Sequence, residues 1–582
     1  MKIIKAIVLL AFFCALAFPI TLHARADAPA ISAEKQRQLE SLFAPWDKKD
    51  SPGCVLAVIR DGTIVYQRGY GMADLERGIA NSPDSVMDIG STSKQFTAAC
   101  VLMLAHRNKL ELDAPLRRYI PEIPEYGKPL TVRHLLHHTS GIRDYLTLMA
   151  LSGLPTTNDY PDEQVLDLIA HQKELNFEPG SEFLYSNSGY FLLAEVVKRV
   201  SGQSLRRFAE ENIFKPLGMT HTHVHDDFTE IVPHRAVGYS PGENGSWVID
   251  MSNFDVVGDG AVLTTVGDLL LWDRNFYHNT LAGVGPGFLE QLQTVGRLNS
   301  GETLDYACGL MVDTYRGLRR VSHGGAWVGY RAQFIRFPEL RFSLICLANA
   351  GSFRPDAMAD KAIDILLQQE FTPPGPGAKE TGKKTMAKPR FLSLSVKELS
   401  RLIGTFRNPD SGAFWRIDLQ EGGLAVKASA GFAFIMKPVG PRTFIGIDTP
   451  FPVTVIFEKA KGVTALGLRV QIADRKPQVF EAIELFAPSE AELAAYAGDY
   501  HSSELEVVLQ VRLRDRQLSA GHRYDPDPAK LQPTLRDEFS ASGVVLSFQR
   551  DGMGRIVGLT AKAGRVKNIV FKKLNQMGGT DH

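Results

Sequence analysis

The sequence predicts an α/β domain followed by two small antiparallel β-barrels. Residues 371–388 are rich in Pro, Gly and Lys, a composition that builds no packed element and therefore indicates a linker. The part that follows holds a weak internal repeat, and each copy leads into short alternating strands with Gly turns, as in small barrels. A chain of 582 residues is also too long for a single core and suggests about three domains.

In the first part of the chain, residues 33–43 predict an amphipathic helix. Residues 55–60 and 63–68 then flank Asp61-Gly62, which is a hairpin signal, so a sheet begins early. Residues 94–105 form an apolar run that predicts a buried helix. Ser91 lies just before this run, so its hydroxyl is expected near the positive end of the helix dipole.

The repeat behind the barrel prediction has a spacing of 94 residues. Glu398-Leu399 with residues 403–406 matches Glu492-Leu493 with residues 497–500. Four strands stand out, at residues 415–419, 453–457, 507–513 and 544–548. We therefore expect the domain order 32–370 (α/β domain), 371–392 (linker), 393–487 (first barrel) and 491–575 (second barrel).

The amino terminus predicts export. Lys2 and Lys5 precede an apolar run at residues 6–18, and Ala24-Arg25-Ala26 offers a small-residue cleavage site, so residues 1–26 are expected to be a signal peptide. A membrane anchor is the alternative, but the run is short for a spanning helix. The mature chain is expected to be periplasmic or secreted, with no stable membrane span.

Charge and cysteine usage narrow the function classes. Lys plus Arg equals Asp plus Glu, so no basic footprint for nucleic acid is visible, and small molecules or peptides are the expected partners. Neither C-x-x-C nor H-E-x-x-H occurs, so no metal site and no cofactor are predicted, and oligomeric state stays open. Buried free thiols are expected at Cys54, Cys100, Cys308 and Cys346.

Three short motifs carry the chemistry of the chain. Ser91 and Lys94 are three residues apart, on one side of a helical turn, so that a hydroxyl and an amine can share a proton. Tyr185-Ser186-Asn187 follows after 94 residues and His323-Gly324-Gly325 after 138 more. Each motif alone is weak, and Ser32 and Tyr277 begin decoys of the first two. The ordered set is what predicts a hydrolytic site.

In these motifs the chain resembles the serine β-lactamase and penicillin-binding protein superfamily, which carries S-x-x-K, Y-x-N and (K/H)-x-G in this order. Residues 88–90, 131–141 and 258–268 resemble accessory segments of the superfamily, and the resemblance spans about residues 32–369. It implies an α/β domain of the β-lactamase/transpeptidase type. It also implies that Ser91 attacks an ester or amide carbonyl and forms an acyl-enzyme.

The resemblance implies roles for the other motif residues. Either Lys94 or Tyr185 acts as general base, and sequence does not rank the two. Asn187 helps to position the substrate amide. His323 replaces a lysine of many β-lactamases and is expected to titrate near neutral pH. Gly325 leaves room for substrate, and the Ala326 N–H forms an oxyanion hole with that of Ser91. Weaker candidates are Asp259, Asp268 and Trp327.

The predicted function is an exported serine hydrolase of amides or esters, most similar in layout to the D-aminopeptidase branch. D,D-carboxypeptidase, esterase or β-lactamase activity are alternatives within the same chemistry. A catalytically idle protein that binds peptidoglycan or another ligand is the alternative from a different class. In the D-aminopeptidase branch a loop of the last barrel reaches the pocket, and residues 521–534, with His522 and Asp525, are the candidate here.

Overall fold

The structure is a computed structural model that describes residues 31–371, 391–428, 433–447, 449, 452–459, 466–472, 477–523 and 525–574. The expected signal peptide (1–26) lies outside these residues, as does most of the expected linker (371–392). Within the described part of the chain, no helix is both long and apolar enough to cross a membrane.

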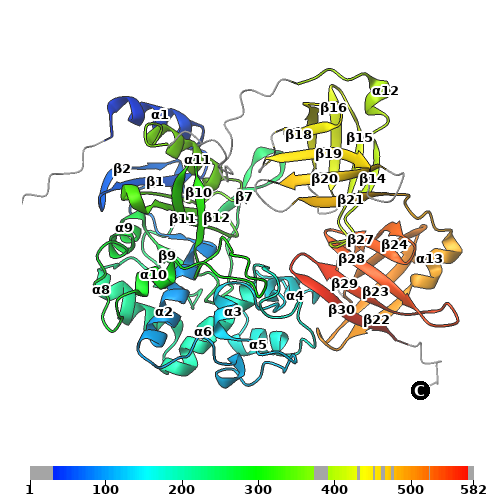
Figure 1. Cartoon of the computed structure of the whole chain (residues 1–582), viewed down its shortest axis with the longest axis horizontal. Coiled ribbons are helices and arrows are strands. Elements are labelled where there is room, and N and C mark those ends of the chain that lie inside the picture. Colours follow the sequence, from blue (N-terminus) through cyan, green and yellow to red (C-terminus); the bar gives the residue numbers. More distant parts are fainter. Residues whose placement is uncertain are drawn as a thin grey trace, which may run out of the picture.

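A six-stranded antiparallel sheet forms the centre of the α/β domain (Figure 1). The predicted hairpin forms one edge of it, and the inner strand of that hairpin pairs with the last strand of the domain. In sheet order the strands are β10 (Met311–Tyr315), β11 (Leu318–Trp327), β12 (Tyr330–Phe337), β13 (Phe342–Ala348), β1 (Cys54–Arg60) and β2 (Thr63–Tyr70).

Helices cover both faces of this sheet. On one face lie α1 (Ala33–Phe43), the predicted amphipathic helix, and α11 (Pro355–Leu366). On the other lie α2 (Lys94–His106), α6 (Asn187–Ser201) and α9 (Val266–Asn275). The remaining elements of the domain include α3 (Val132–Leu136), α4 (Tyr145–Leu151), α5 (Asp162–Ala170), α7 (Leu205–Ala209), α8 (Lys215–Leu217), α10 (Phe288–Leu292), β3 (Met72–Asp74), β4 (Ile79–Ala80), β5 (Met87–Asp88), β6 (His223–Val224), β7 (Tyr239–Pro241), β8 (Trp247–Ile249) and β9 (Val262–Thr264).

Strand β1 shows why the sheet is buried on both sides. Val55, Ala57 and Ile59 join the core shared with α2, whereas Leu56 and Val58 join the core shared with α1 and α11. Successive side chains of a strand point to opposite faces, so a continuous apolar run is what a doubly covered strand needs. The cysteines expected as buried free thiols are free and buried: Cys54, Cys100, Cys308 and Cys346.

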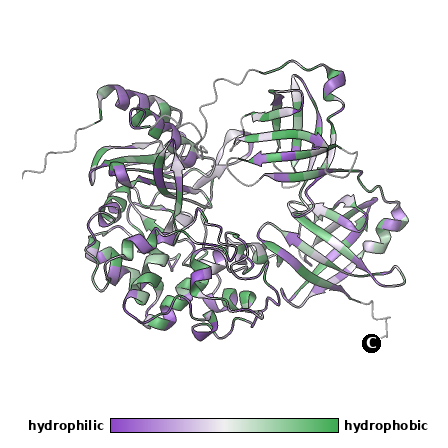
Figure 2. Cartoon of the chain, viewed as in Figure 1, coloured by the Kyte–Doolittle hydropathy of each residue, from purple (hydrophilic) through white to green (hydrophobic). Residues whose placement is uncertain are grey.

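Two β-barrels follow, as the sequence predicts. The first is closed, in the order β14 (Gly404–Arg407), β15 (Phe414–Gln420), β16 (Gly423–Ala428), β17 (Ala433–Pro438), β18 (Thr443–Ile447), β19 (Val453–Lys459), β20 (Leu466–Ile472) and β21 (Gln478–Ile483). Buried and less buried residues alternate along strands such as β17, and both hydrophobic and hydrophilic residues occur along the strands of this barrel (Figure 2). This alternation fits a barrel with an apolar interior and a wet exterior.

The second barrel is a nine-stranded antiparallel sheet that is nearly closed, because its two outer strands adjoin along the chain. In sheet order the strands are β25 (Ala529–Lys530), β24 (Gln517–Gly521), β23 (Val507–Arg514), β22 (Gly498–Ser502), β30 (Val566–Lys573), β29 (Ile556–Ala563), β28 (Val544–Arg550), β27 (Glu538–Ala541) and β26 (Gln532–Leu535).

The sequence repeat has a structural counterpart at the start of each barrel. A short helix, α12 (Val396–Leu399) or α13 (Glu490–Tyr496), begins with a Ser-Glu capping box, and a strand follows. Gly404 and Gly498 open these strands with φ of 151° and 149°, a conformation that favours glycine. The two barrels therefore begin with the same helix, glycine and strand unit.

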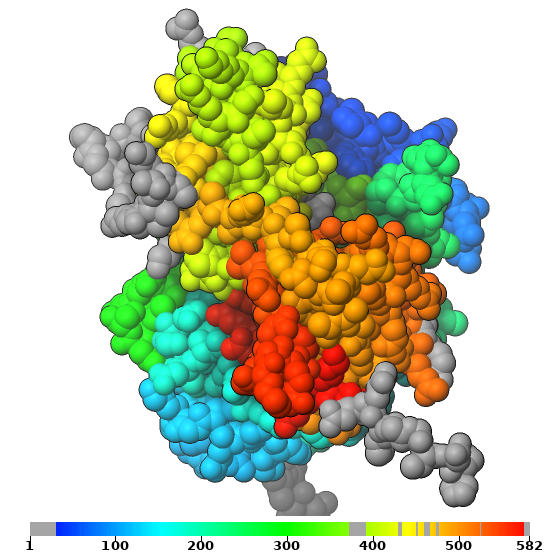
Figure 3. Space-filling model, turned by 90° about the vertical axis from the view of Figure 1, so that its right-hand side faces the viewer, coloured from blue at the N-terminus to red at the C-terminus, as the bar shows by residue number. Residues whose placement is uncertain are grey.

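The second barrel packs against the α/β domain (Figure 3), and the helix beside it is α4 (Figure 1). Leu148 of α4 belongs to the apolar core of this barrel. Next to it, Arg143 donates from Nη1 to Glu504 of the β22–β23 loop at 2.6 Å, and the two side chains are 0% and 4% exposed. Arg143 Nη2 also donates to the Asn568 carbonyl at 3.1 Å. A buried ion pair therefore joins the two domains.

Replacing Glu504 by glutamine is expected to weaken this junction by about 3 to 5 kcal/mol, because the variant leaves the Arg143 charge buried without its carboxylate. Calorimetry should show an earlier transition, and limited proteolysis should cut the second barrel sooner. Glu506→Gln on the same loop is the control, since the Glu506 side chain is 72% exposed and lies 3.8 Å from His171. Equal melting of the two variants would contradict this role of Glu504.

Candidate active site

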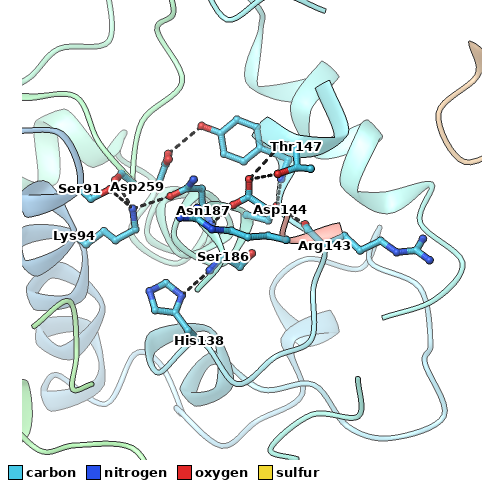
Figure 4. A network of polar contacts seen from close by, with 12 residues as sticks. Ser91, Lys94, His138, Arg143, Asp144, Thr147, Ser186, Asn187 and Asp259 are labelled. Carbon is cyan, nitrogen blue, oxygen red and sulfur yellow. Dashed lines mark hydrogen bonds and ion pairs between the residues drawn. The ribbon is translucent and has the colours of Figure 1, made fainter. Parts of the chain in front are cut away.

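Ser91 lies in a 3-10 turn, Gly90–Ser93, directly before α2. Gly90 has φ of +49°, and a Cβ placed on it would lie 2.6 Å from the Ala326 nitrogen. This glycine therefore allows both the turn and the close approach of β11. Lys94 begins α2, and its Nζ lies 3.1 Å from Ser91 Oγ (Figure 4). The pairing predicted for the first motif is present.

Lys94, the first residue of α2, is fully buried against the start of α6. Besides Ser91, its Nζ contacts Asn187 Oδ1 at 2.9 Å and the Asp259 carbonyl oxygen at 2.6 Å. Burial lowers the pKa of Lys94 to about 8, while Asp259 opposes the shift and Arg565 adds to it. Amide and carbonyl oxygens only accept hydrogen bonds, so a neutral amine that donates to both directs its lone pair at the Ser91 hydroxyl.

The Tyr185 side chain lies half-buried beside this pair, with its hydroxyl buried. Its ring centroid lies 4.9 Å from Lys94 Nζ, and the ring packs at a tilt of 36° against the His138 ring, with centroids 4.1 Å apart. The buried hydroxyl makes no hydrogen bond within the described part of the chain. Burial raises the pKa of Tyr185, while the nearby Ser91 hydroxyl and the Arg565 guanidinium lower it. The phenol therefore keeps its proton at neutral pH, with the Ser91 hydroxyl close enough to act on it.

His323 is a neutral, buried imidazole. Nδ1 lies 2.6 Å from the Gly324 carbonyl oxygen, which can only accept, so Nδ1 carries the proton and Nε2 accepts from the Tyr306 hydroxyl at 3.0 Å. Burial lowers the pKa of His323 to about 4, and the charge of Lys94 acts in the same direction. The expectation that His323 titrates near neutral pH is wrong, because desolvation disfavours its charged form.

His323 is therefore expected to stay uncharged between about pH 5.5 and 8. Titration of nitrogen-labelled histidine by NMR should give a resonance with the Nδ1–H tautomer and a midpoint near the lowered pKa, and His323→Asn should remove that resonance. A midpoint near 6.5, or the Nε2–H tautomer, would contradict the assignment.

The last part of strand β11 faces the Ser91 turn with the edge that is not paired to β10. Its pairing with β10 ends at Ser322, so residues 323–327 have β12 on one side and the turn on the other. Thr92 Oγ1 donates to the His323 carbonyl at 3.2 Å, and a Cβ on Gly325 would lie 1.8 Å from the Ile89 carbonyl oxygen. Only glycine fits there. The backbone N–H groups of Ser91 and Ala326 thus lie on facing segments, as an oxyanion hole requires.

A cavity of about 70 Å³ opens at Ser91. Asn187 and Ala326 line it together with Asp259 and Trp327, whereas Lys94, Tyr185, His323 and Gly325 do not. The Asp259 carboxylate accepts from the Tyr145 hydroxyl at 3.1 Å. Burial raises the pKa of Asp259 to about 6, while the charge of Lys94 opposes the shift.

Sequence reasoning missed Asp144, which supports the site from behind. Asp144 caps α4 and its Oδ2 accepts from the Asn187 N–H at 2.7 Å (Figure 4). It also missed Arg565, whose guanidinium lies 4.8 Å over the Tyr185 ring. A Ser, Thr, Asp or Asn before a helix is a readable cap signal, but no local signal marks Arg565.

The described residues of the loop 521–534 do not line the cavity at Ser91. His522 of this loop lies against Gly153, where a Cβ would come within 2.5 Å of the imidazole, and Tyr524 lies outside the described residues.

One side-chain cluster has donor atoms spaced for a metal ion. The ligand atoms of His223, His225 and Glu230 lie within 4.8 Å of one another. Two of these residues are already hydrogen-bonded to arginines. Arg206 donates two hydrogen bonds to Glu230 at 2.8 Å, and Arg235 contacts His225 Nε2 at 3.2 Å. Both cations oppose a further positive charge, so the cluster fits a hydrogen-bonded network.

Comparison with known proteins gives four findings. A family model described as Beta-lactamase matches residues 39–368. The chain is 29% identical over 397 residues to "Penicillin-binding protein 4*" of Bacillus subtilis, covering 65% of this chain and 84% of that protein. It is 26% identical over 546 residues to a D-aminopeptidase of Brucella canis, covering 90% and 96%. A solved octameric penicillin-binding protein homologue from Pyrococcus abyssi has the same fold, with a TM-score of 0.54 and 22% identity over 77% of this chain and 99% of that one.

Proposed function

The chain belongs to the beta-lactamase family and is a serine hydrolase, and from this premise we propose that it is an exported D-aminopeptidase acting on amides or short peptides. The contact of Ser91 Oγ with Lys94 Nζ at the cavity carries the proposal of hydrolysis. The match to D-aminopeptidases over 90% of the chain, far beyond residue 368, supports the choice of substrate class. The signal-peptide pattern of residues 1–26 supports export.

In the proposed reaction, Lys94 takes the proton of Ser91 while Oγ forms a bond to the substrate carbonyl carbon. When the tetrahedral intermediate collapses, the C–N bond breaks and the leaving amine receives that proton through the Tyr185 hydroxyl, which has no other partner in the described chain. Water then attacks the acyl-serine ester, and the same groups return the proton to Ser91.

Backbone and amide groups hold the substrate in this scheme. The N–H groups of Ser91 and Ala326 stabilise the oxyanion, and such a donor contributes about 3 to 4 kcal/mol to lowering a barrier. Asn187 orients the substrate amide from the cavity wall while its carbonyl holds Lys94. His323, being neutral, supports β11 through Gly324 and contributes no charge to the reaction.

Asp259 supports the choice of a substrate with a free amine. Asp259 lines the cavity, and one oxygen of its carboxylate accepts from the Tyr145 hydroxyl. An ammonium group can pair with a buried carboxylate far better than an acylated amine can, because the latter leaves the charge desolvated without a partner. We therefore assign Asp259 to recognition of the substrate α-amine.

A panel of matched substrates tests the proposed function. D-alanine p-nitroanilide should be cleaved with a kcat/KM at least about 100-fold above those of the L-isomer and of N-acetyl-D-alanine p-nitroanilide, a ratio within reach of one charged contact and one steric contact. Diacetyl-lysyl-D-alanyl-D-alanine, a simple phenyl ester and a cephalosporin represent the other activities. A preference for any of these three, or ligand binding without turnover, would overturn the D-aminopeptidase assignment.

A further inference from the structure

The hairpin formed by β29 and β30 brings the second barrel next to the active site. Its turn is held by backbone contacts, since Asn176 Nδ2 donates to the Arg565 carbonyl at 2.8 Å and Asn176 Oδ1 accepts from the Lys567 N–H at 2.8 Å. Both contacts involve main-chain atoms of the hairpin. Substitutions of the side chains at residues 565 and 567 therefore leave the groups that make these two contacts in place.

From this turn the Arg565 side chain reaches two residues of the site. Its guanidinium lies 4.8 Å over the Tyr185 ring, and Nη1 lies 3.4 Å from Asp144 Oδ2. The same Asp144 oxygen accepts from the Asn187 N–H, and Asn187 in turn holds Lys94. Arg565 thus contacts one member of the predicted catalytic set directly, Tyr185, and is linked to Lys94 through Asp144 and Asn187. Its side chain remains 41% exposed.

We propose that Arg565 is a positioning residue of the active site, supplied by the second barrel, whose positive charge tunes the proton transfer among Ser91, Lys94 and Tyr185. The proposal rests on the roles given above to these three residues. It makes the site a composite of two domains, complete only when the barrel is docked. The contribution of the barrel is then electrostatic and acts through Tyr185 and Asp144.

The charges around Lys94 and Tyr185 give the sign of the effect. Asp144 and Asp259 raise the pKa values of both groups, whereas Arg565 lowers both. The other titratable side chains that face these two come from several elements and are uncharged at neutral pH through burial: His138, Tyr145, Tyr190, Tyr306 and His323. Removing Arg565 therefore removes positive charge that offsets the two carboxylates. The pKa values of Lys94 and Tyr185 then rise, and the base becomes harder to deprotonate.

The test follows kcat/KM for p-nitrophenyl acetate against pH, because this ester needs the nucleophile but no particular amino acid. In the wild type the acid limb should lie near the pKa of about 8 of Lys94. Arg565→Gln should move it upward by about half to one pH unit. Activity should then fall about three- to tenfold at pH 7 and recover above about pH 9.5. Arg565→Lys should keep the wild-type limb.

Lys567→Gln is the matched control. Lys567 is a cation on the same hairpin, and its Nζ lies 3.8 Å from Glu182, so its removal changes the net charge equally but away from the site. Its profile should match the wild type. If the profile of Arg565→Gln matched that of the wild type, the proposal would be overturned. An equal loss of activity at every pH would also overturn it, because such a loss indicates only a structural role for Arg565.

A second readout separates this proposal from the proposed function. The rate at which a fluorophosphonate labels Ser91 reports activation of the hydroxyl without turnover, and it should show the same shift of its acid limb in Arg565→Gln. A shift with no cleavage of D-amino acid substrates would leave the proposal standing and remove the D-aminopeptidase assignment. Wild-type protein that neither cleaves the ester nor reacts with the probe would remove both.

Discussion

Ser91→Ala is expected to lower kcat/KM for every substrate by at least about 10⁴-fold, because the variant has no atom that can form the acyl-enzyme. The fold should persist. The Ser91 hydroxyl contacts Lys94, and in the variant Lys94 keeps its contacts to Asn187 and to the Asp259 carbonyl. Steady-state kinetics together with the melting temperature measure the two effects separately.

The decoy Ser32 provides the control for that experiment. Its hydroxyl accepts from the Lys35 N–H at 3.3 Å and caps α1, outside the cavity. Ser32→Ala should therefore cost about 1 kcal/mol of stability and no activity. Ser91→Ala is expected to lose activity and keep its fold, whereas Ser32→Ala is expected to lose some stability and keep its activity. Near-normal turnover by Ser91→Ala would contradict the mechanism.

Lys94→Met is expected to lower kcat/KM at pH 7 by about 10²- to 10⁴-fold, the usual contribution of a general base. The protein should still fold, because two effects of similar size oppose each other. Holding an ammonium with a pKa lowered to about 8 costs about 3 kcal/mol at neutral pH, and methionine avoids this cost. Against this, Asn187 Oδ1 and the Asp259 carbonyl lose their donor, at about 1 to 3 kcal/mol each.

Comparison with Tyr185→Phe identifies the base. Phenylalanine retains the ring that packs on His138 and removes only a hydroxyl without a hydrogen-bond partner in the described chain. If Lys94 takes the proton from Ser91, Lys94→Met should lose more activity toward an activated ester than Tyr185→Phe, because a good leaving group needs no proton. The reverse order would assign the base to Tyr185.

Much of the fold could be predicted from local sequence, because the relevant signals are local. The helix expected at residues 33–43 is α1, Ala33–Phe43, and the hairpin around Asp61-Gly62 is that of β1 and β2. Each of the four barrel strands expected lies within an observed strand, β15, β19, β23 or β28. Alternation with period two and a turn signal suffice for such elements, and they need no knowledge of distant contacts.

The central residues of the site could be predicted for a different reason, because the order of the three motifs along the chain indicates which residues lie together in space. Ser91, Lys94, Tyr185, Asn187 and the β11 motif do meet. Their electrostatics could not be predicted. The neutral state of His323 follows from burial against Lys94 and Tyr306, which no pattern in the sequence reveals.

The barrel contacts were the hardest to predict. Arg143 and Glu504 are separated by 361 residues, and Arg565 lies 421 residues from Asp144. The sequence directed attention to the loop 521–534 because it is rich in polar and proline residues, yet the structure places the unremarkable turn at Arg565 against Tyr185. Polarity indicates an exposed loop but carries no information on which loop faces the other domain.

Intact-protein and peptide mass spectrometry after reaction with a fluorophosphonate tests the central claim most directly, because it locates the nucleophile itself. The account predicts a single phosphonyl adduct, on the peptide that contains Ser91, formed faster as pH rises through about 8 and absent from Ser91→Ala. An adduct on any other residue, or a full adduct on Ser91→Ala, would contradict it.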